Sequence, residues 1–276
     1  PGGQFQLLAV RRMGVKYGFL HHGESFYVRT NSDSPGSRLM VVPETDTAPE
    51  NWREKLAARP GVTLEQASIF RHHLVLLEKQ AGQRRVRIEN LDGEGSHYIE
   101  FPEQLYSVEG WQNREFITNR FRMAYSSMLV PLSFFEYNMD ARRWESIHEV
   151  SFKGYRRENY TTERVEAKTA AGISIPISLV YRKRPGRSAA PLLLRVYGSY
   201  GINLDPWMNP LDLSLLERGA TIGIAHVRGG GDLGARWHED GRLLKKKNSI
   251  GDLIACIDHL VKTGYATPDR LILSGQ

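Results

Sequence analysis

Hydrophobic and polar residues alternate along the first half of the chain, up to about residue 152, and a period of two is typical of β-strands. The clearest alternating segments are 25–30, 39–42, 74–78, 86–90, 115–118 and 134–138. Turn-forming residues at 90–93 and 138–140 follow two of them, one repeat apart. Repeats of about 40 to 50 residues are typical of propeller blades. The pattern predicts blades at 1–60, 61–107 and 108–152, with an all-β sandwich as the alternative.

A propeller needs at least four blades, so we expect further blades before Pro1. The polar, basic run at 154–162 has no apolar pattern and predicts an interdomain linker. We therefore expect a partial β-propeller over 1–153 and a second domain over 163–276. That domain should begin with a hairpin, formed by 164–168 and 173–181 around a Thr-Ala-Ala-Gly turn.

The pattern after residue 190 is that of an α/β domain. Continuous apolar runs at 192–196, 220–227 and 271–273 predict buried strands, and 211–217 predicts a helix between the first two. A longer helix should be capped by Asn248 or Ser249 and end before Gly264. Its expected apolar stripe is Ile250, Leu253, Ile254, Ile257, Leu260 and Val261. Alternating strands and helices predict a parallel sheet with crossover helices.

The composition allows globular domains, because 41% of the 276 residues are hydrophobic. No apolar run reaches the roughly 18 residues of a membrane span, and Pro1-Gly2-Gly3 does not begin a signal peptide, so we expect no membrane partner. The formal charge of +6 comes from short, scattered clusters, which favour solvated surface over nucleic-acid binding. The lone Cys256 cannot form an intramolecular disulfide; we expect a cytoplasmic protein, with a periplasmic location as the alternative.

The last residues are typical of a strand that enters a nucleophile elbow. The strand 271–273 leads into Ser274-Gly275-Gln276, and in the G-x-S-x-G elbow Gly275 would be the first glycine and Gln276 the second residue. The nucleophilic serine would follow Gln276. Many strands end in glycine, so an ordinary turn is the alternative. By contrast, Ser188 in the elbow-like segment 186–190 precedes a strand and is interpreted as a loop serine.

A glycine-rich segment, Gly229-x-Gly231-x-x-Gly234, follows the strand 220–227 and formally matches the dinucleotide fingerprint. The residues after it are too polar for the helix of that motif, so a glycine-rich loop at a sheet edge is favoured over nucleotide binding. His226, just before these glycines, is interpreted as a buried imidazole with satisfied hydrogen bonds.

Tyr197 ends the strand 192–196 at the edge where open α/β sheets bind ligands. Its hydroxyl could donate a hydrogen bond to an oxyanion. The alternative is a tyrosine that packs its ring beneath a glycine-rich loop. The adjacent pairs at 21–22 and 72–73 point to opposite sheet faces, so neither histidine pair can chelate a metal.

Taken together, several segments resemble the prolyl oligopeptidase family of serine peptidases, and within it the oligopeptidase B branch. The segments 197–201 (YGSYG), 215–219 (LLERG), 226–234 (HVRGGGDLG), 237–241 (WHEDG) and 245–248 (KKKN) carry the resemblance in order and spacing. Further similarity lies at 11–12, 26–31 and 125–128, so the resemblance covers nearly the whole chain. It implies a β-propeller followed by the start of an α/β-hydrolase domain.

The resemblance also implies a Ser-Asp-His triad beyond Gln276, no metal and no organic cofactor. Tyr197 matches the position of the family's oxyanion tyrosine, and Tyr200 matches a position near the substrate pocket. Asp232 stands where relatives usually have Glu, and is a second candidate for the substrate pocket. Arg195 and Val196 depart from the Tyr-Gly that relatives commonly have before this tyrosine.

We therefore expect the complete protein to be a serine oligopeptidase that cleaves short peptides after Arg or Lys, and the 276-residue chain alone to be inactive. The alternatives are a family member with esterase or lost activity, and a propeller that acts as an interaction module.

Overall fold

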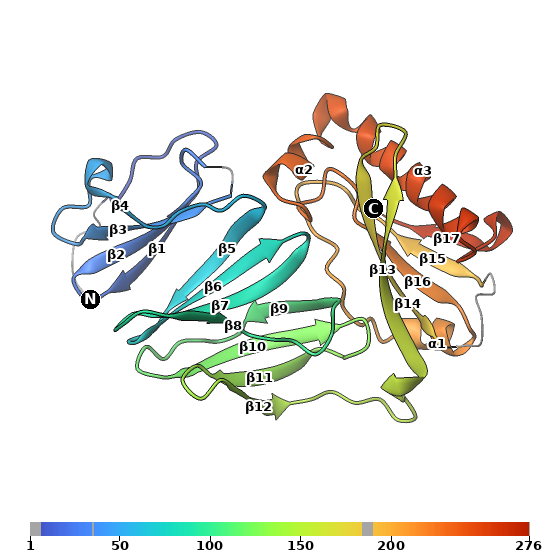
Figure 1. The fold of residues 1–276 in the computed structure, drawn as a ribbon, viewed down its shortest axis with the longest axis horizontal. Helices are drawn as coiled ribbons and strands as arrows, with labels where there is room; N and C mark the ends of the chain where they lie inside the picture. The colour runs from blue at the N-terminus through green and yellow to red at the C-terminus, as the bar shows by residue number, and fades with distance from the viewer. Residues whose placement is uncertain (1–6, 35, 184–189, 276) are drawn as a thin grey trace.

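The computed structural model describes residues 7–34, 36–183 and 190–275. Its first half contains three four-stranded antiparallel sheets, each built from strands consecutive in the chain, as expected for propeller blades (Figure 1). Blade 1 contains β1 (Tyr17–His22), β2 (Ser25–Thr30), β3 (Arg38–Pro43) and β4 (Arg53–Leu56). Blade 2 contains β5 (Val62–Ile69), β6 (His73–Gln80), β7 (Gln83–Asn90) and β8 (Ser96–Tyr98). Blade 3 contains β9 (Tyr106–Gly110), β10 (Arg120–Ser127), β11 (Ser133–Asn138) and β12 (Arg143–His148).

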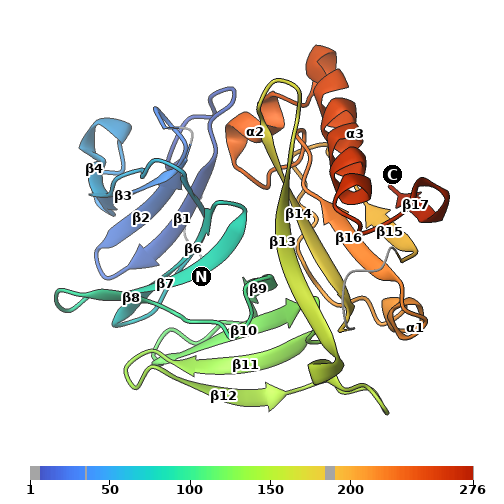
Figure 2. The same cartoon turned by 45° about the vertical axis from the view of Figure 1, so that its right-hand side comes forward.

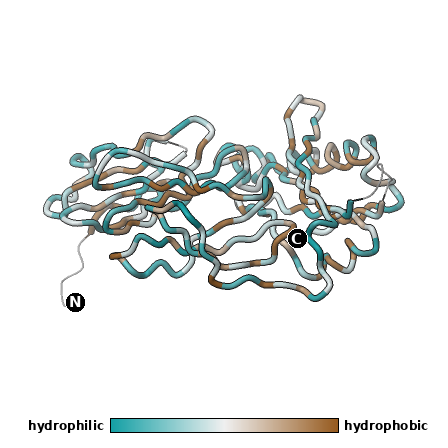
Figure 3. The backbone as a smooth tube through the Cα atoms, turned by 60° about the horizontal axis from the view of Figure 1, so that its bottom comes forward, coloured by the Kyte–Doolittle hydropathy of each residue, from teal (hydrophilic) through white to brown (hydrophobic). Residues whose placement is uncertain are grey.

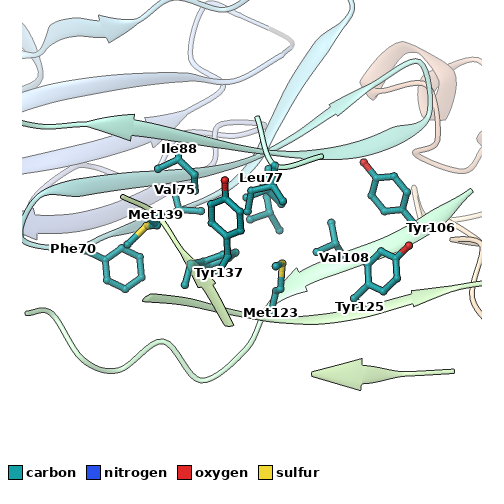
Figure 4. Close-up of a cluster of buried hydrophobic side chains, with 13 residues drawn as sticks. Phe70, Val75, Leu77, Ile88, Tyr106, Val108, Met123, Tyr125, Tyr137 and Met139 are labelled. Carbon is teal, nitrogen blue, oxygen red and sulfur yellow. The ribbon is translucent and has the colours of Figure 1, made fainter. Parts of the chain in front are cut away.

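Blade 2 is covered on both faces, and this explains why β6 is almost continuously apolar. Leu74 and Leu76 pack toward blade 1, whereas Val75 and Leu77 join a core shared with blade 3. Figure 4 shows this second core between the two sheets, with Phe70 and Met123 among its side chains. Figure 3 shows hydrophobic and hydrophilic positions following one another along the propeller strands, as the period of two requires.

Two details of the propeller differ from the sequence-based expectations. The segment 115–118 is a loop with Ile117 largely exposed, because the Asn113 side chain bonds the backbone N–H and C=O of Arg122 and holds the loop beside β10. Blade 3 also begins at Tyr106 rather than at 108, since Tyr106 already pairs with Ser127 of β10. The third blade therefore takes its first strand partly from the range expected for the second.

The second half forms one five-stranded mixed sheet in the order β13-β14-β16-β15-β17 (Figure 2). Its strands are β13 (Tyr160–Lys168), β14 (Ser174–Arg182), β15 (Leu192–Arg195), β16 (Thr221–Ala225) and β17 (Leu271–Ser274). The long hairpin β13–β14 is antiparallel, and β15, β16 and β17 are parallel. Because β13 begins at Tyr160, the expected linker 154–162 is wrong in its last three residues, which pair with β14.

The helices are α1 (Asp212–Glu217), α2 (Ala235–Glu239) and α3 (Lys247–Lys262), and short 3₁₀ turns occur at Pro49–Asn51, Arg157–Asn159, Leu243–Lys245 and Pro268–Arg270. Cys256 and Leu260 of α3 pack on one face of the sheet. The other face packs against Leu216 of α1 and against Leu105 and Met128 of the propeller, so one core joins the two domains. No helix among the described residues is long and apolar enough to cross a membrane.

The buried face of α3 is rotated from the expected stripe. Ile250 and Ile254 are each 54% exposed, whereas Ser249 and Asp252 are buried. The helix starts at Lys247, so Asn248 and Ser249 lie inside it and do not cap it. The helix is rotated because its polar residues form hydrogen bonds with the loops at the end of the sheet, as described below.

Candidate active site at the carboxyl ends of the parallel strands

The candidate site lies where β15, β16 and β17 end side by side. These strands run parallel, so the segments that follow them, 196–201, 226–234 and Gly275, meet at one edge of the sheet. This is the edge where open α/β sheets place their ligands. The structure therefore brings together three of the segments that the sequence analysis singled out.

Gly275 packs directly against Val196, which lies between the end of β15 and Tyr197. The backbone N–H of Val196 donates to the carbonyl oxygen of Ser274 at 2.9 Å, one pair beyond the end of the ladder. A Cβ on Gly275 would lie 2.7 Å from the carbonyl oxygen of Val196. Only glycine allows this approach, which puts the expected start of the elbow next to Tyr197. Gln276 and Ser188 lie outside the described residues.

Glycines also join the other two loops, through backbone-to-backbone contacts. A Cβ on Gly229 would lie 2.0 Å from the carbonyl oxygen of Gly198, and one on Gly231 would lie 2.5 Å from that of Gly201. A Cβ on Gly241 would lie 2.1 Å from the backbone nitrogen of Gly229. The helix after this segment, α2, has only five residues. Close packing of loops thus explains the glycines of 229–234. This agrees with the interpretation as a glycine-rich loop at a sheet edge.

The two tyrosines of this edge are placed differently. Tyr197 is half-buried at the end of β15, whereas Tyr200 is 84% exposed and has a φ of 55°, in the left-handed region that non-glycine residues rarely adopt. Both lie on the loop that contacts Gly229. Their roles in binding an oxyanion and a substrate side chain stay predictions.

Asp232 is buried, and its carboxylate is already paired. Its Oδ1 lies 2.9 Å from Nδ1 of His226, whose Nε2 lies 2.8 Å from the Ser178 hydroxyl. All three residues are at most 4% exposed, so the three side chains are buried and hydrogen-bonded to one another. The prediction that His226 is a satisfied buried imidazole is confirmed. A substrate-binding role of Asp232 stays a prediction.

The propeller and the second domain meet beside Asp232 around a cavity of about 680 Å³. On the propeller side it is lined by Lys79 and Gly82, and on the other side by Asp232 and Arg236. Arg164 of β13 donates to the carbonyl oxygen of Ala81 at 3.2 Å. Burial lowers the pKa of the Arg164 guanidinium, and the negative charge of Asp232 opposes that shift.

A second interdomain contact is ionic. Asp205, on the segment that follows Tyr200, forms an ion pair with Arg84 of blade 2 at 3.0 Å and lies 3.8 Å from the Lys79 ammonium. Arg84 also binds Glu65 and Glu109 at 2.8 and 2.9 Å. The loop that carries Tyr197 and Tyr200 is therefore tied to the propeller by charge.

The polar residues that support these loops were not predicted from the sequence. Lys246 donates to the Gly198 carbonyl and to the Ser199 hydroxyl, Ser249 donates to the Arg228 carbonyl, and Asp252 accepts from Arg228. The available signal was their spacing of three residues, which places them on one helix face. Without the fold, nothing distinguished that face from a solvated one.

Other candidates have no part in this edge. Cys256 is fully buried, and burial raises the pKa of its thiol to about 12, so little reactive thiolate forms near neutral pH. Among residues 7–34, 36–183 and 190–275, no three His, Cys, Asp or Glu side chains gather as metal ligands would.

Comparisons with known proteins assign the chain to a family. Residues 1–149 match the model of the prolyl oligopeptidase N-terminal β-propeller domain, and 207–276 match that of the prolyl oligopeptidase family. Dipeptidyl aminopeptidase BI from Pseudoxanthomonas mexicana is 35% identical over 99% of this chain and 38% of its own length. Protease 2 from Moraxella lacunata is 30% identical over 100% of this chain and 40% of its own length.

Among solved structures, oligopeptidase B from Trypanosoma brucei with covalently bound antipain, in a closed form, is 29% identical with a TM-score of 0.89 over 97% of this chain and 39% of that one. Oligopeptidase B from Leishmania major is 28% identical with the same TM-score and the same coverage. The chain thus spans about two fifths of the length of these relatives. The expected fold class, propeller blades followed by the start of a hydrolase domain, is confirmed. The chain belongs to the prolyl oligopeptidase family.

Proposed function

We propose that the complete protein containing this chain is a serine peptidase that hydrolyses short peptides through an acyl-enzyme. The observation that carries the proposal is the packing of Gly275 against Val196, which brings the expected elbow beside Tyr197. A nucleophile and an oxyanion donor must lie this close, because both act on the same carbonyl group. Family membership supplies the expectation that a serine follows Gln276.

In the proposed reaction the serine oxygen bonds to the peptide carbonyl carbon and its proton passes to the triad histidine. The carbonyl oxygen becomes an oxyanion, to which the Tyr197 hydroxyl and a backbone N–H donate. Collapse breaks the C–N bond, and the histidine returns the proton to the leaving amine. Water then hydrolyses the acyl-enzyme by the same sequence of steps.

We propose cleavage after Arg or Lys, in line with the oligopeptidase B relatives. The name of the Pseudoxanthomonas relative favours a second candidate, release of dipeptides from a free amino terminus. Peptides with Arg-X or Pro-X bonds, each with a free and a blocked amino terminus, distinguish them. Cleavage of Pro-X but not Arg-X peptides would reject the basic preference, and cleavage that requires a free amino terminus would support the second candidate.

The mechanistic test is Tyr197→Phe in the complete protein. Loss of one oxyanion donor should lower kcat about 10²-fold or more, with little change in KM. Tyr200→Phe on the same loop is the comparison, since a residue near the substrate pocket should change KM rather than kcat. An unchanged kcat for Tyr197→Phe would remove Tyr197 from the mechanism.

The same experiments separate the enzyme from the interaction-module alternative. If the codon after Gln276 does not encode serine, or if purified complete protein hydrolyses none of the peptides, the serine-peptidase proposal fails.

A further inference from the structure

A polar stripe at the start of α3 faces the loops of the candidate site, and its first member, Lys246, is the half-buried residue just before the helix. Lys246, Ser249 and Asp252 follow one another at intervals of three residues, so their side chains share a helix face. Ser249 is 4% exposed and Asp252 is fully buried. Burying a carboxylate and a hydroxyl on a helix face costs free energy unless each is hydrogen-bonded, so the partners of this stripe explain why it is there.

Lys246 binds the loop that carries Tyr197. Its ammonium donates to the carbonyl oxygen of Gly198 and, at 2.8 Å, to the hydroxyl of Ser199, the two residues that follow Tyr197. Hydrogen bonds from a charged donor are stronger and shorter than neutral ones. Gly198 has a φ of 67°, so the chain turns sharply at the point that the ammonium holds.

Ser249 and Asp252 bind the neighbouring loop at Arg228. The Asp252 carboxylate accepts from the backbone N–H of Arg228 at 2.9 Å and from its guanidinium, and Ser249 donates to the Arg228 carbonyl. Gly229, the next residue, is the one that packs on Gly198. One helix face therefore fixes both loops, which press on each other through glycine contacts.

We propose that Lys246 is a positioning residue for the oxyanion tyrosine, acting through the Gly198 carbonyl; this inference rests on the proposed function of Tyr197. The direction of Tyr197 is set by β15 on one side, where Val196 pairs with Ser274, and by Lys246 on the other. Loss of the ammonium leaves the strand end fixed but releases the turn after Tyr197. A shift of about 1 Å at such a site costs up to about 10²-fold in rate.

The test compares Lys246→Met with Lys247→Met in the complete protein. Lys247 is the adjacent lysine and is exposed, so it controls for loss of one positive charge. We expect Lys246→Met to lower kcat by about 10- to 100-fold with KM within about threefold, and Lys246→Arg to recover much of the loss because it restores a charged donor. Lys247→Met should match the wild type.

A double-mutant cycle separates positioning from a general structural effect. If Lys246 acts through Tyr197, Lys246→Met in a Tyr197→Phe background should lower kcat by less than about threefold, because the group that it positions is gone. Equal losses in both backgrounds would overturn the inference. A Lys246→Met variant with wild-type kcat would also overturn the inference. The proposed peptidase function would stand in that case, because the wild type would still be active.

Hydrogen exchange tests the same inference without turnover. The amides of Gly201 and Ile202 donate to the Gly229 and Ser199 carbonyls, so they report the order of this loop. We expect them to exchange about tenfold faster in Lys246→Met than in Lys247→Met, with amides of β16 unchanged. Equal exchange in the two variants would overturn the positioning role even if the protein proves to have no peptidase activity.

Discussion

The contact between blades 2 and 3 and the contact between the loops of the candidate site are both tight, but different atoms fill them. Between the blades, large side chains fill the space, among them Phe121 and, as Figure 4 shows, Tyr125. Between the loops, backbone atoms of Gly198, Gly229 and Gly241 meet directly. The blades are therefore sensitive to volume that is removed, and the site is sensitive to volume that is added.

The largest expected change in stability comes from a substitution that breaks the side-chain contact between the blades. Phe121 is fully buried in the core between the blades, so Phe121→Ala should lower the free energy of unfolding by about 3–5 kcal/mol. Urea titrations followed by circular dichroism measure it. Ile117→Ala is the control, because Ile117 is 72% exposed on a nearby loop and its truncation should stay within about 0.5 kcal/mol. Similar losses in both would show that the core does not depend on Phe121.

The next effect breaks the backbone contact by adding one methyl group. Gly229→Ala should destabilise by about 1–3 kcal/mol, since its Cβ would overlap the Gly198 carbonyl and its φ is 97°. Gly251→Ala is the matched control, because Gly251 lies inside α3 with no atom within 4 Å of the added Cβ. It should instead stabilise by about 0.5–1 kcal/mol. Two shifts of the same sign in thermal unfolding would contradict the comparison.

The smallest effect lies between the two regions. Asp205→Asn removes the ion pair with Arg84 and should destabilise by about 1 kcal/mol or less, since the pair is partly exposed. Its effect should shrink as salt is raised from 0.05 to about 1 M, where screening is strong. Asp33→Asn, an exposed partner of Arg38 within blade 1, is the control and should have a smaller effect. An effect independent of salt would reject an ionic link between the domains.

The sequence predicts the side-chain-packed region better than the backbone-packed one. Alternation places β2, β3, β7 and β11 because each strand's own residues record which face is buried, and the apolar run at 74–77 places β6. It fails at 115–118, where the Asn113 side chain binds the backbone of Arg122, a contact that alternation does not record. Tyr197 and Gly275 are recognisable as candidates from the strands that precede them.

The support of the site could not be predicted in the same way. Asp252 looks like an ordinary polar residue of an amphipathic helix. Only the fold shows that its carboxylate accepts a hydrogen bond from the backbone N–H of Arg228. Ile250 and Ile254 look like core residues, yet polar contacts rotate the helix and leave both exposed. Such contacts join segments far apart in the chain, and a local pattern carries no record of them.

The strand order described above has a consequence for the path of folding. Every blade pairs only consecutive strands, so each can close as soon as its own residues are available, and such local contacts form quickly. In the second sheet β15 lies between β16 and β17. Leu192 therefore cannot complete its backbone pairing until Thr221 and Leu271, both later in the chain, are available. Until they arrive, β15 has unpaired edges that can associate with other chains. We therefore expect the early blades to be protected from proteases well before the loop of Tyr197 is in place.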